Sequence, residues 1–321
     1  MSLHPQLWPA AVGAIAGFAA LVWASICLAR RWERLANLRR WGAIAALAVF
    51  EVALWLHVYA WFIEPNRLIV RRVEIESPYW SGAPLTIAAI GDTHVASPHV
   101  DSARMGRIVA RVNALRPDIV LLLGDYAGSH ESEARRTGRE RSEVLGGIAT
   151  FAAFNAPLGA VGVLGNHDSW YGRQIVAGAM EEAGVATLWN RHVVLARGDE
   201  EFVIAGLADF DTGAPDLAAA LDGAPVRDTI VIAHSPDAFT GLPAGAALML
   251  AGHGHCGQVS IPFLGRPILP LRNRRYGCHL VQDSGKIIYV TAGIGTSILP
   301  VRFLNPPEIV LITLREAVAR A

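Results

Sequence analysis

Residues 85–94 read LTIAAIGDTH, a β-type apolar run that leads directly into Gly91, Asp92 and His94. The same order recurs four more times along the chain, where an apolar run ends in residues that commonly bind metal ions. The further endings are IVLLL before Gly124-Asp125, VGVL before Gly165-Asn166-His167-Asp168, IVIA before His234, and LMLA before Gly252-His253-Gly254-His255. Ligands of α/β sheets gather at the carboxyl ends of strands, so we expect all five endings to meet in one crevice.

The residue types in these endings suit a pair of divalent cations. Two aspartates, one asparagine and four or five histidines are enough for two ions that share one carboxylate. A mixed imidazole and carboxylate shell favours Mn, Fe, Zn or Ni over Mg or Ca, which prefer oxygen ligands. Such a pair clamps a phosphoryl group and supplies a nucleophile at neutral pH, and a histidine outside the shell can protonate the leaving oxygen. The pattern therefore predicts hydrolysis of a phosphoester or pyrophosphate.

The region around these endings reads as one α/β domain. Short β-type runs alternate with helical periodicity, and residues 128–141, rich in Ser, Glu and Arg, read as a loop that could overhang the site. The expected helices are 102–115, 142–154 and 173–183. The expected strands are 85–90, 119–123, 161–164, 193–196, 202–205, 230–233, 248–251, 287–291 and 308–313.

Two long apolar stretches precede this domain, at residues 7–29 and 41–63. The first carries no charge, and Glu51 is the one charged residue of the second apart from His57. Each is long enough to cross a hydrocarbon core of about 30 Å at about 1.5 Å per residue. A signal peptide would show a basic stretch before the apolar run and a small-residue cleavage site after it, and neither is evident. The sequence predicts two transmembrane helices.

The charges around the two stretches predict an orientation. The loop between them holds five arginines against one glutamate, whereas the residues before Leu7 contain no lysine or arginine. Basic residues favour the cytoplasmic side, so we expect the loop inside and both flanks outside. Arg67, Arg71 and Arg72 follow the second stretch and weigh against this orientation. We expect a multi-pass protein of the cell inner membrane with an extracytoplasmic catalytic domain.

Composition excludes other classes of protein. Hydrophobic residues make up 52% of the 321 residues, 28 basic residues balance 28 acidic ones, and the mean hydropathy is +0.34. These values exclude intrinsic disorder, and the neutral balance argues against a nucleic-acid partner. Cys27, Cys256 and Cys278 lie far apart without a CxxC spacing, so no disulfide framework is indicated. We expect Cys256 to be a packed structural thiol.

The five endings, in this order, resemble the signature blocks of calcineurin-like metallophosphoesterases over about residues 84–315. The resemblance implies an α/β fold, a two-sheet sandwich flanked by helices on both outer faces, here following the transmembrane hairpin. It implies one metal ion held by Asp92, His94, Asp125 and His255. It implies a second ion held by Asp125, Asn166, His234 and His253, with Asp125 bridging. His167 would be the general acid beside the phosphate and not a ligand.

A narrower resemblance concerns the membrane-anchored branch of the family typified by YkuE and YaeI. It rests on GHGHCGQ at 252–258 and on GIGTS at 293–297, PVRF at 300–303 and PPE at 306–308. This branch is related to UDP-2,3-diacylglucosamine pyrophosphatases of lipid A synthesis. The substrate is then a phosphate-containing small molecule or a lipid. Three functions stay open: a membrane-anchored phosphodiesterase or pyrophosphatase, that lipid A enzyme, and a non-catalytic metal-binding sensor.

The chain departs from the family pattern in two places. Many members read GDxxD, where the second Asp supports the catalytic histidine, but here that position is Gly128. Asp168 or a backbone carbonyl could orient His167 instead. Gly254 and Cys256 replace Thr and Gly of the usual GHTHGGQ, which points to altered substrate fit. Arg302 could reach a phosphate or form a surface salt bridge.

We therefore divide the chain into a hairpin at residues 1–63, a linker at 64–83 and a metallophosphoesterase domain at 84–321. His99, His130, His192 and His279 have no ligand spacing, and we expect them to be structural.

Overall fold

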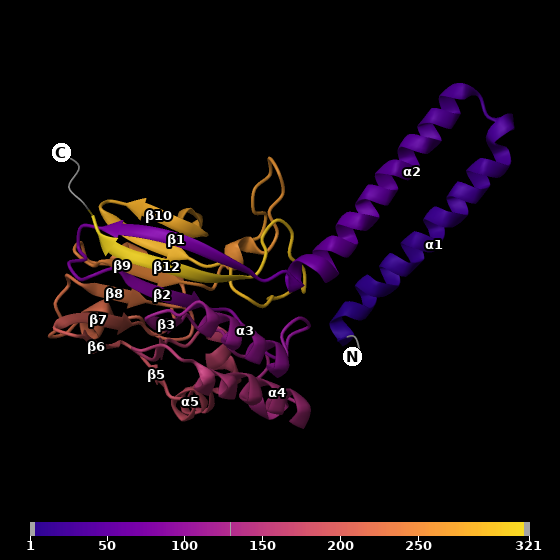
Figure 1. Ribbon diagram of the computed structural model, residues 1–321. Helices are drawn as coiled ribbons and strands as arrows, with labels where there is room; N and C mark the ends of the chain where they lie inside the picture. The colour runs from indigo at the N-terminus through magenta and orange to yellow at the C-terminus, as the bar shows by residue number, and fades with distance from the viewer. Residues whose placement is uncertain (1–3, 129, 318–321) are drawn as a thin grey trace.

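The computed structural model describes residues 4–128 and 130–317, and its main body is a pair of six-stranded sheets (Figure 1). The first sheet has the order β1-β12-β2-β3-β4-β5 and the second β10-β11-β9-β8-β7-β6. The strands of the first are β1 (Ile69–Ser77), β2 (Leu85–Ile90), β3 (Ile119–Leu122), β4 (Ala160–Gly162), β5 (Val185–Thr187) and β12 (Glu308–Glu316). Those of the second are β6 (Arg191–Arg197), β7 (Glu200–Gly206), β8 (Thr229–Ile232), β9 (Leu248–Ala251), β10 (His279–Asp283) and β11 (Lys286–Val290).

The central strands are parallel and buried on both faces. β2 to β5 run parallel in one sheet, as do β7, β8, β9 and β11 in the other. Their near-continuous apolar sequences suit strands that are covered on both sides. Ile87 and Leu121 of the first sheet share a core with Ile232 and Leu250 of the second. The sheets therefore form a sandwich whose parallel strands carry their carboxyl ends to one edge.

Helices cover the outer face of the first sheet, as Figure 1 shows. They are α3 (Ser102–Ala114), α4 (Gly138–Ala149) and α5 (Asn166–Glu182). The second sheet is covered by α6 (Leu217–Ala220) and the 3-10 segment Pro236–Gly241, which pack on it through Ala220 and Phe239. The expected two-sheet sandwich flanked by helices is confirmed.

Several element boundaries differ from the sequence-based expectations. α4 begins at Gly138, four residues early, because Thr137 and Glu140 form a capping box; Ser129 of the expected loop 128–141 lies outside the described residues. A helical segment that begins at Asn166 precedes the expected helix at 173–183, and a kink at Gly172 (φ 145°) separates the two within α5, so the GNHD block opens a helix. The sequence did not predict β1, β5 and β10. β1 lies inside the expected linker and pairs in parallel with β12, from Ile69 opposite Glu308 onward. We propose that the folded domain begins near residue 64.

The two N-terminal helices, α1 (Trp8–Arg31) and α2 (Asn37–Val58), form an antiparallel hairpin that stands away from the sheets (Figure 1). α2 continues through a π-helical turn, Tyr59–Ile63, and a 3-10 turn, Glu64–Asn66. A hydrogen bond joins the His57 ring to the Ala10 carbonyl oxygen (3.1 Å). Most side chains of both helices are exposed, and both are long and apolar enough to cross a membrane.

The end of the second helix is bonded directly to the domain. The Glu64 carboxylate is buried and accepts the backbone N–H groups of Leu304 (2.8 Å) and Asn305. The N–H of Arg302 donates to the Ala60 carbonyl oxygen at 3.0 Å. The side chain of Arg104 donates to the carbonyl oxygen of the adjoining Pro65 at 3.0 Å. The hairpin therefore leaves the domain at a defined place.

Another buried carboxylate, Glu308, joins the two sheets. It accepts hydrogen bonds from the Arg71 guanidinium (2.5 Å), the Ala292 N–H (3.0 Å) and the Thr291 hydroxyl (3.2 Å). Burial opposes its charge, but the His279 ring 3.6 Å away and the hydrogen bond from Arg71 lower its pKa to about 2 from an ordinary value of 4.5.

Replacing Glu308 with Gln should therefore destabilise the domain in a pH-dependent way. A depressed carboxyl pKa stabilises the fold fully above the unfolded value of 4.5 and loses this effect as the pH falls toward 2. We expect a cost of about 3 kcal/mol at pH 7, constant down to about pH 5 and shrinking below it. Denaturant unfolding in detergent at several pH values measures it. Glu74→Gln, at a carboxylate that is 69% exposed, is the control. A Glu308→Gln difference that persisted unchanged at pH 3 would contradict the assignment.

Candidate metal centre

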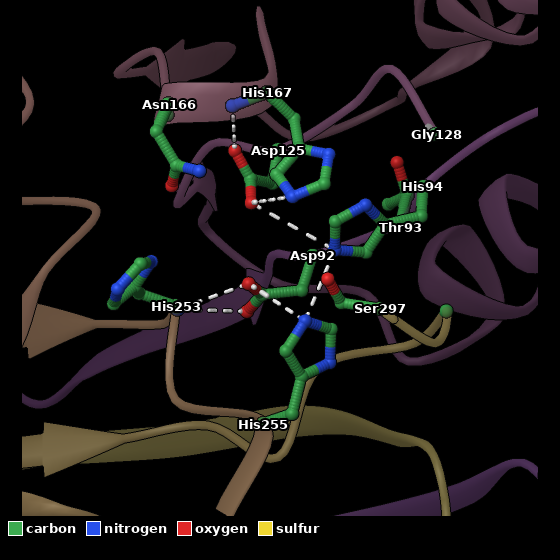
Figure 2. A network of polar contacts seen from close by, with 12 residues as sticks. Asp92, Thr93, His94, Asp125, Gly128, Asn166, His167, His253, His255 and Ser297 are labelled. Carbon is green, nitrogen blue, oxygen red and sulfur yellow. Dashed lines mark hydrogen bonds and ion pairs between the residues drawn. The ribbon is translucent and has the colours of Figure 1, made fainter. Parts of the chain in front are cut away.

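The structure brings all the predicted site residues together at the carboxyl edge of both sheets, and Figure 2 labels each of them except His234. Each occupies the place that its strand ending predicted. Asp92 and His94 follow β2, Asp125 follows β3, Asn166 and His167 begin α5 after β4, His234 follows β8, and His253 and His255 follow β9. The strand ends of the first sheet thus face those of the second across one crevice.

One cluster of donor atoms comes from Asp92, His94 and His255. The Nε2 atoms of His94 and His255 lie 3.0 Å apart. The His255 Nε2 atom is 3.5 Å from Oδ1 of Asp92, and the His94 Nε2 atom is 3.7 Å from Oδ2 of Asp125. Two ring nitrogens and two carboxylates therefore point at the same small volume.

A second cluster surrounds the ring of His234. Its Nε2 atom lies 3.1 Å from Oδ1 of Asn166, 3.1 Å from Nδ1 of His253 and 3.2 Å from Oδ2 of Asp125. This Asp125 oxygen is the same atom that faces His94 in the first cluster. A single carboxylate oxygen is thus shared by both groups of donors.

The donor set fits divalent cations. The Nδ1 atom of His234 lies 2.9 Å from the Leu123 carbonyl oxygen and donates its proton there, so the Nε2 atom faces the cluster and can offer its lone pair to a cation. Without a cation, the facing nitrogens of His94 and His255 would set two lone pairs against each other unless one carried a proton. A cation between the two nitrogens removes this repulsion. It would also neutralise the nearby carboxylate oxygens of Asp92 and Asp125.

Burial is the largest single influence on the pKa values of the histidines and aspartates in these clusters. Burial lowers the pKa of His94 and of His255 well below the ordinary value, which keeps both rings in the neutral form that binds metals. Burial raises the pKa of Asp92 to about 7. Burial also opposes the charge of Asp125, but His234 and His167 hold the pKa of that carboxyl well below its usual range. These buried carboxylates require nearby positive charge.

The backbone at these positions is strained. Positive φ angles occur at Asp92 (51°), His94 (43°), Asp125 (56°), His253 (65°) and His255 (46°). Residues other than glycine rarely adopt this left-handed region, and such strain concentrates at functional sites. The strand ends therefore turn sharply enough to direct both members of the Asp92–His94 and His253–His255 pairs into the crevice.

Gly128 and Asp168 explain the departure from the GDxxD pattern. A Cβ at residue 128 would lie 2.8 Å from the carbonyl oxygens of both His94 and Val95, so an aspartate does not fit there. The Asp168 carboxylate does not orient the ring of His167 either. It accepts four backbone N–H groups, from Asp125 (2.8 Å), Tyr126 (2.8 Å), Ala127 (3.0 Å) and Gly165 (3.0 Å). Asp168 therefore holds the loop that carries the shared carboxylate.

His167 lies at the edge of both clusters and on the wall of a cavity of about 260 Å³. Its ring packs edge-to-face on His94, with centroids 4.5 Å apart, and its Nε2 atom is 3.9 Å from Oδ2 of Asp125. His130 and Trp170 lie beside it, with ring centroids 4.6 and 4.9 Å away, and also line the cavity. His130, which we expected to be structural, thus lies on the cavity wall, and its irregular spacing in the sequence gave no signal of this place.

The structure contradicts two expectations, a surface salt bridge at Arg302 and a free thiol at Cys256. Arg302 is fully buried and donates to the carbonyl oxygens of Ala292 (2.8 Å), Gly295 (2.6 Å) and Asn305 (2.9 Å). It holds the 292–305 loop from the interior and forms no salt bridge with another described residue. Cys256 forms a disulfide with Cys278, 22 residues away in sequence, because the loop between them returns to the site. Its sulfur is therefore not a free thiol.

With this geometry in view, comparison with known proteins identifies the class. Residues 85–257 match the model of the calcineurin-like phosphoesterase family, and the chain belongs to this family. It is 30% identical to the uncharacterised metallophosphoesterase YkuE of Bacillus subtilis, over 85% of this chain and 94% of that protein. It is 28% identical to the phosphodiesterase YaeI of Escherichia coli, over 80% and 92% of the two chains. It is 29% identical to a transmembrane protein with a metallophosphoesterase domain from Danio rerio, over 79% of this chain and 58% of that protein.

The role of Asp168 can be tested with Asp168→Asn. The amide nitrogen of Asn cannot accept the N–H groups that the carboxylate now accepts, so we expect a loss of about 2–4 kcal/mol in unfolding free energy and a lower metal content. Thermal unfolding and elemental analysis measure the two effects. Asp101→Asn is a matched control, because Asp101 caps α3 through one N–H and Asn caps helices equally well. Equal behaviour of the two variants would refute the role of Asp168.

Proposed function

We propose that this protein is a membrane-anchored, dinuclear metal-dependent phosphoesterase that hydrolyses a phosphodiester or a pyrophosphate, with a lipid-linked substrate. The observation that carries this proposal is the single oxygen of Asp125 that faces both clusters of donor atoms. A shared carboxylate oxygen is the arrangement that two neighbouring cations need. Membership of the calcineurin-like phosphoesterase family supports the reaction class.

The proposed ligands divide into two sets. Asp92, His94, Asp125 and His255 hold one divalent transition metal ion, and Asp125, Asn166, His234 and His253 hold the other. The imidazole-rich shells favour Mn, Fe, Zn or Ni. Bound ions of this kind clamp the oxygens of a phosphoryl group and supply a nucleophile at neutral pH.

In this proposal His167 is the general acid. Its ring lies between the donor clusters and the cavity, where a phosphate held by the site would present its leaving oxygen. A protonated imidazole there donates its proton as the ester bond breaks, which avoids the release of a free alkoxide. Packing against His94 and Trp170 limits the movement of the ring and keeps it at the edge of the site.

We propose that α1 and α2 make the protein a multi-pass protein of the cell inner membrane with an extracytoplasmic catalytic domain. The arginine-rich loop between the helices supports this orientation. The disulfide between Cys256 and Cys278 supports it independently, since disulfides persist in oxidising compartments. Both observations argue against the function of a lipid A pyrophosphatase, because the substrate of that enzyme is on the cytoplasmic side of the membrane. The complete donor set with His167 argues against a non-catalytic sensor.

Asp125→Ala and His167→Asn separate metal binding from proton donation. Asp125→Ala should abolish hydrolysis of bis(p-nitrophenyl) phosphate and remove metal, because both clusters lose their shared oxygen. His167→Asn should lower kcat by about 10²–10⁴-fold with the metal content unchanged, the usual range for a general acid. Steady-state kinetics and elemental analysis of the same preparations measure both. Full activity of His167→Asn, or loss of its metal, would show that His167 is not the proposed acid.

The orientation is tested by fusing reporters to the C-terminus. Alkaline phosphatase is active only outside the cytoplasm and green fluorescent protein folds best inside it, so we expect an active phosphatase fusion and a dark fluorescent one. Replacing the five arginines of the loop at 30–40 with Gln should weaken this preference. A bright fluorescent fusion with an inactive phosphatase fusion would overturn the extracytoplasmic placement.

A further inference from the structure

Large apolar side chains are exposed on the two loops whose residues Ile268 and Ile298 line the metal-site cavity. We call this set the apolar rim, and it consists of Phe263, Leu264, Ile268, Ile298 and Leu299. Phe263 is wholly exposed (108%), Leu264 is 77% exposed and Ile298 is 72% exposed. In Figure 1 the orange loop that stands away from the sheets lies on the side where α2 meets the domain. Clustered apolar exposure of this kind marks an interaction site.

The backbone holds these side chains outward. Residues Ile261 and Gly265 exchange two backbone hydrogen bonds, both 2.8 Å, which close a tight turn with Phe263 at its tip. Phe263 and Ile298 have positive φ angles of 67° and 64°, a conformation in which glycine or asparagine is usual. Large apolar residues at such positions strain the backbone and expose apolar surface to water. This exposure favours a partner that covers their side chains.

The apolar rim is fixed next to the end of the second apolar helix. The N–H of Arg302 donates to the Ala60 carbonyl oxygen (3.0 Å), and the Phe303 ring packs on Tyr59, with centroids 6.3 Å apart. The N–H of Ser260 in turn donates to the Phe303 carbonyl oxygen at 2.8 Å. Two backbone hydrogen bonds, one at Ser260 and one at Arg302, therefore connect the loop that carries Phe263 to the end of α2, where the chain would leave the bilayer.

The charges around the apolar rim match a membrane surface. Residues 258–275 contain four arginines and no acidic residue. Arg274 and Arg272 are exposed, while Arg275 pairs with Asp283 at 3.3 Å. Apolar side chains flanked by basic ones favour the interface of a bilayer with anionic lipids.

Two residues of the apolar rim also line the metal centre's cavity. Ile268 and Ile298 line the same cavity of about 260 Å³ as His167, His253 and His255. A molecule that enters this cavity along the rim therefore passes from an apolar surface to the donor clusters.

We propose that the apolar rim inserts into the interfacial layer of the bilayer that holds the hairpin, so that the site takes its substrate from the membrane. The substrate is then an acyl-bearing phosphate lipid whose chains stay in the bilayer while its phosphate reaches the clusters. This inference rests on the proposed membrane anchoring and phosphoesterase activity.

Insertion can be measured without any catalysis. The full-length protein with Cys27→Ala and Phe263→Cys is labelled with an environment-sensitive fluorophore and placed in nanodiscs of phosphatidylcholine and phosphatidylglycerol. We expect a blue-shifted emission that lipids with a doxyl group near the headgroup quench. The control is Val194→Cys in the same background, an exposed position on β6 at the opposite edge of the second sheet. Equal quenching at residues 263 and 194 overturns the inference.

Activity then tests the route of the substrate. Phe263→Asp with Leu264→Asp should lower kcat/KM for a long-chain phosphodiester lipid in vesicles by about tenfold more than for bis(p-nitrophenyl) phosphate. The matched control is Leu280→Asp, at an exposed apolar position on β10. It should change kcat/KM for the lipid and for bis(p-nitrophenyl) phosphate to the same extent. Equal losses on both substrates overturn lipid entry through the rim. If the wild type hydrolyses neither substrate, the proposed function fails, while the quenching result still decides membrane insertion.

Discussion

The organisation of this protein depends on the need to neutralise buried donor atoms that converge from strand ends of two sheets. Asp92 and Asp125 lie in the interior beside the ligand-type imidazoles, and burial is the largest of the causes that raise the pKa of Asp92 to about 7. Ionised carboxylates are costly in such surroundings without paired positive charge. The strained backbone at five of these residues shows that the surrounding fold imposes the arrangement. Sheet packing supplies the energy that holds the donors together, and cations would supply the charge.

The need to hold these buried donor atoms in place explains the roles of residues that take no part in the chemistry. Asp168 uses its whole carboxylate on four backbone N–H groups, three of them in the loop that carries Asp125. Arg302 organises the opposite wall through three carbonyl oxygens. That wall also donates backbone N–H groups to the Glu64 carboxylate and to the Ala60 carbonyl oxygen, so the helix end and the metal centre share one scaffold. The end of α2 and the metal centre are thus connected through the 292–305 loop.

Sequence reasoning succeeded where a local pattern reflects a local cause. β2 and β9 have the predicted bounds because four to six apolar residues followed by glycine describe a buried strand with a sharp end. It failed for β1, whose partner β12 lies more than two hundred residues away and supplies the pairing that its own residues do not encode. It also missed the first segment of α5, from Asn166 to the kink at Gly172, because Asn166 and His167 resemble turn residues but follow a glycine that lets a helix begin.

The amino-acid order alone determined the kinds of ligand, their succession along the strands and the apolar hairpin before them, since these depend on residue type and spacing. Only the folded chain decided that one oxygen of Asp125 faces both clusters, that His130 joins the cavity, and that Cys256 meets Cys278. These are distances between segments remote in sequence. They follow from how two sheets pack, which is a property of the whole interior and of no single motif.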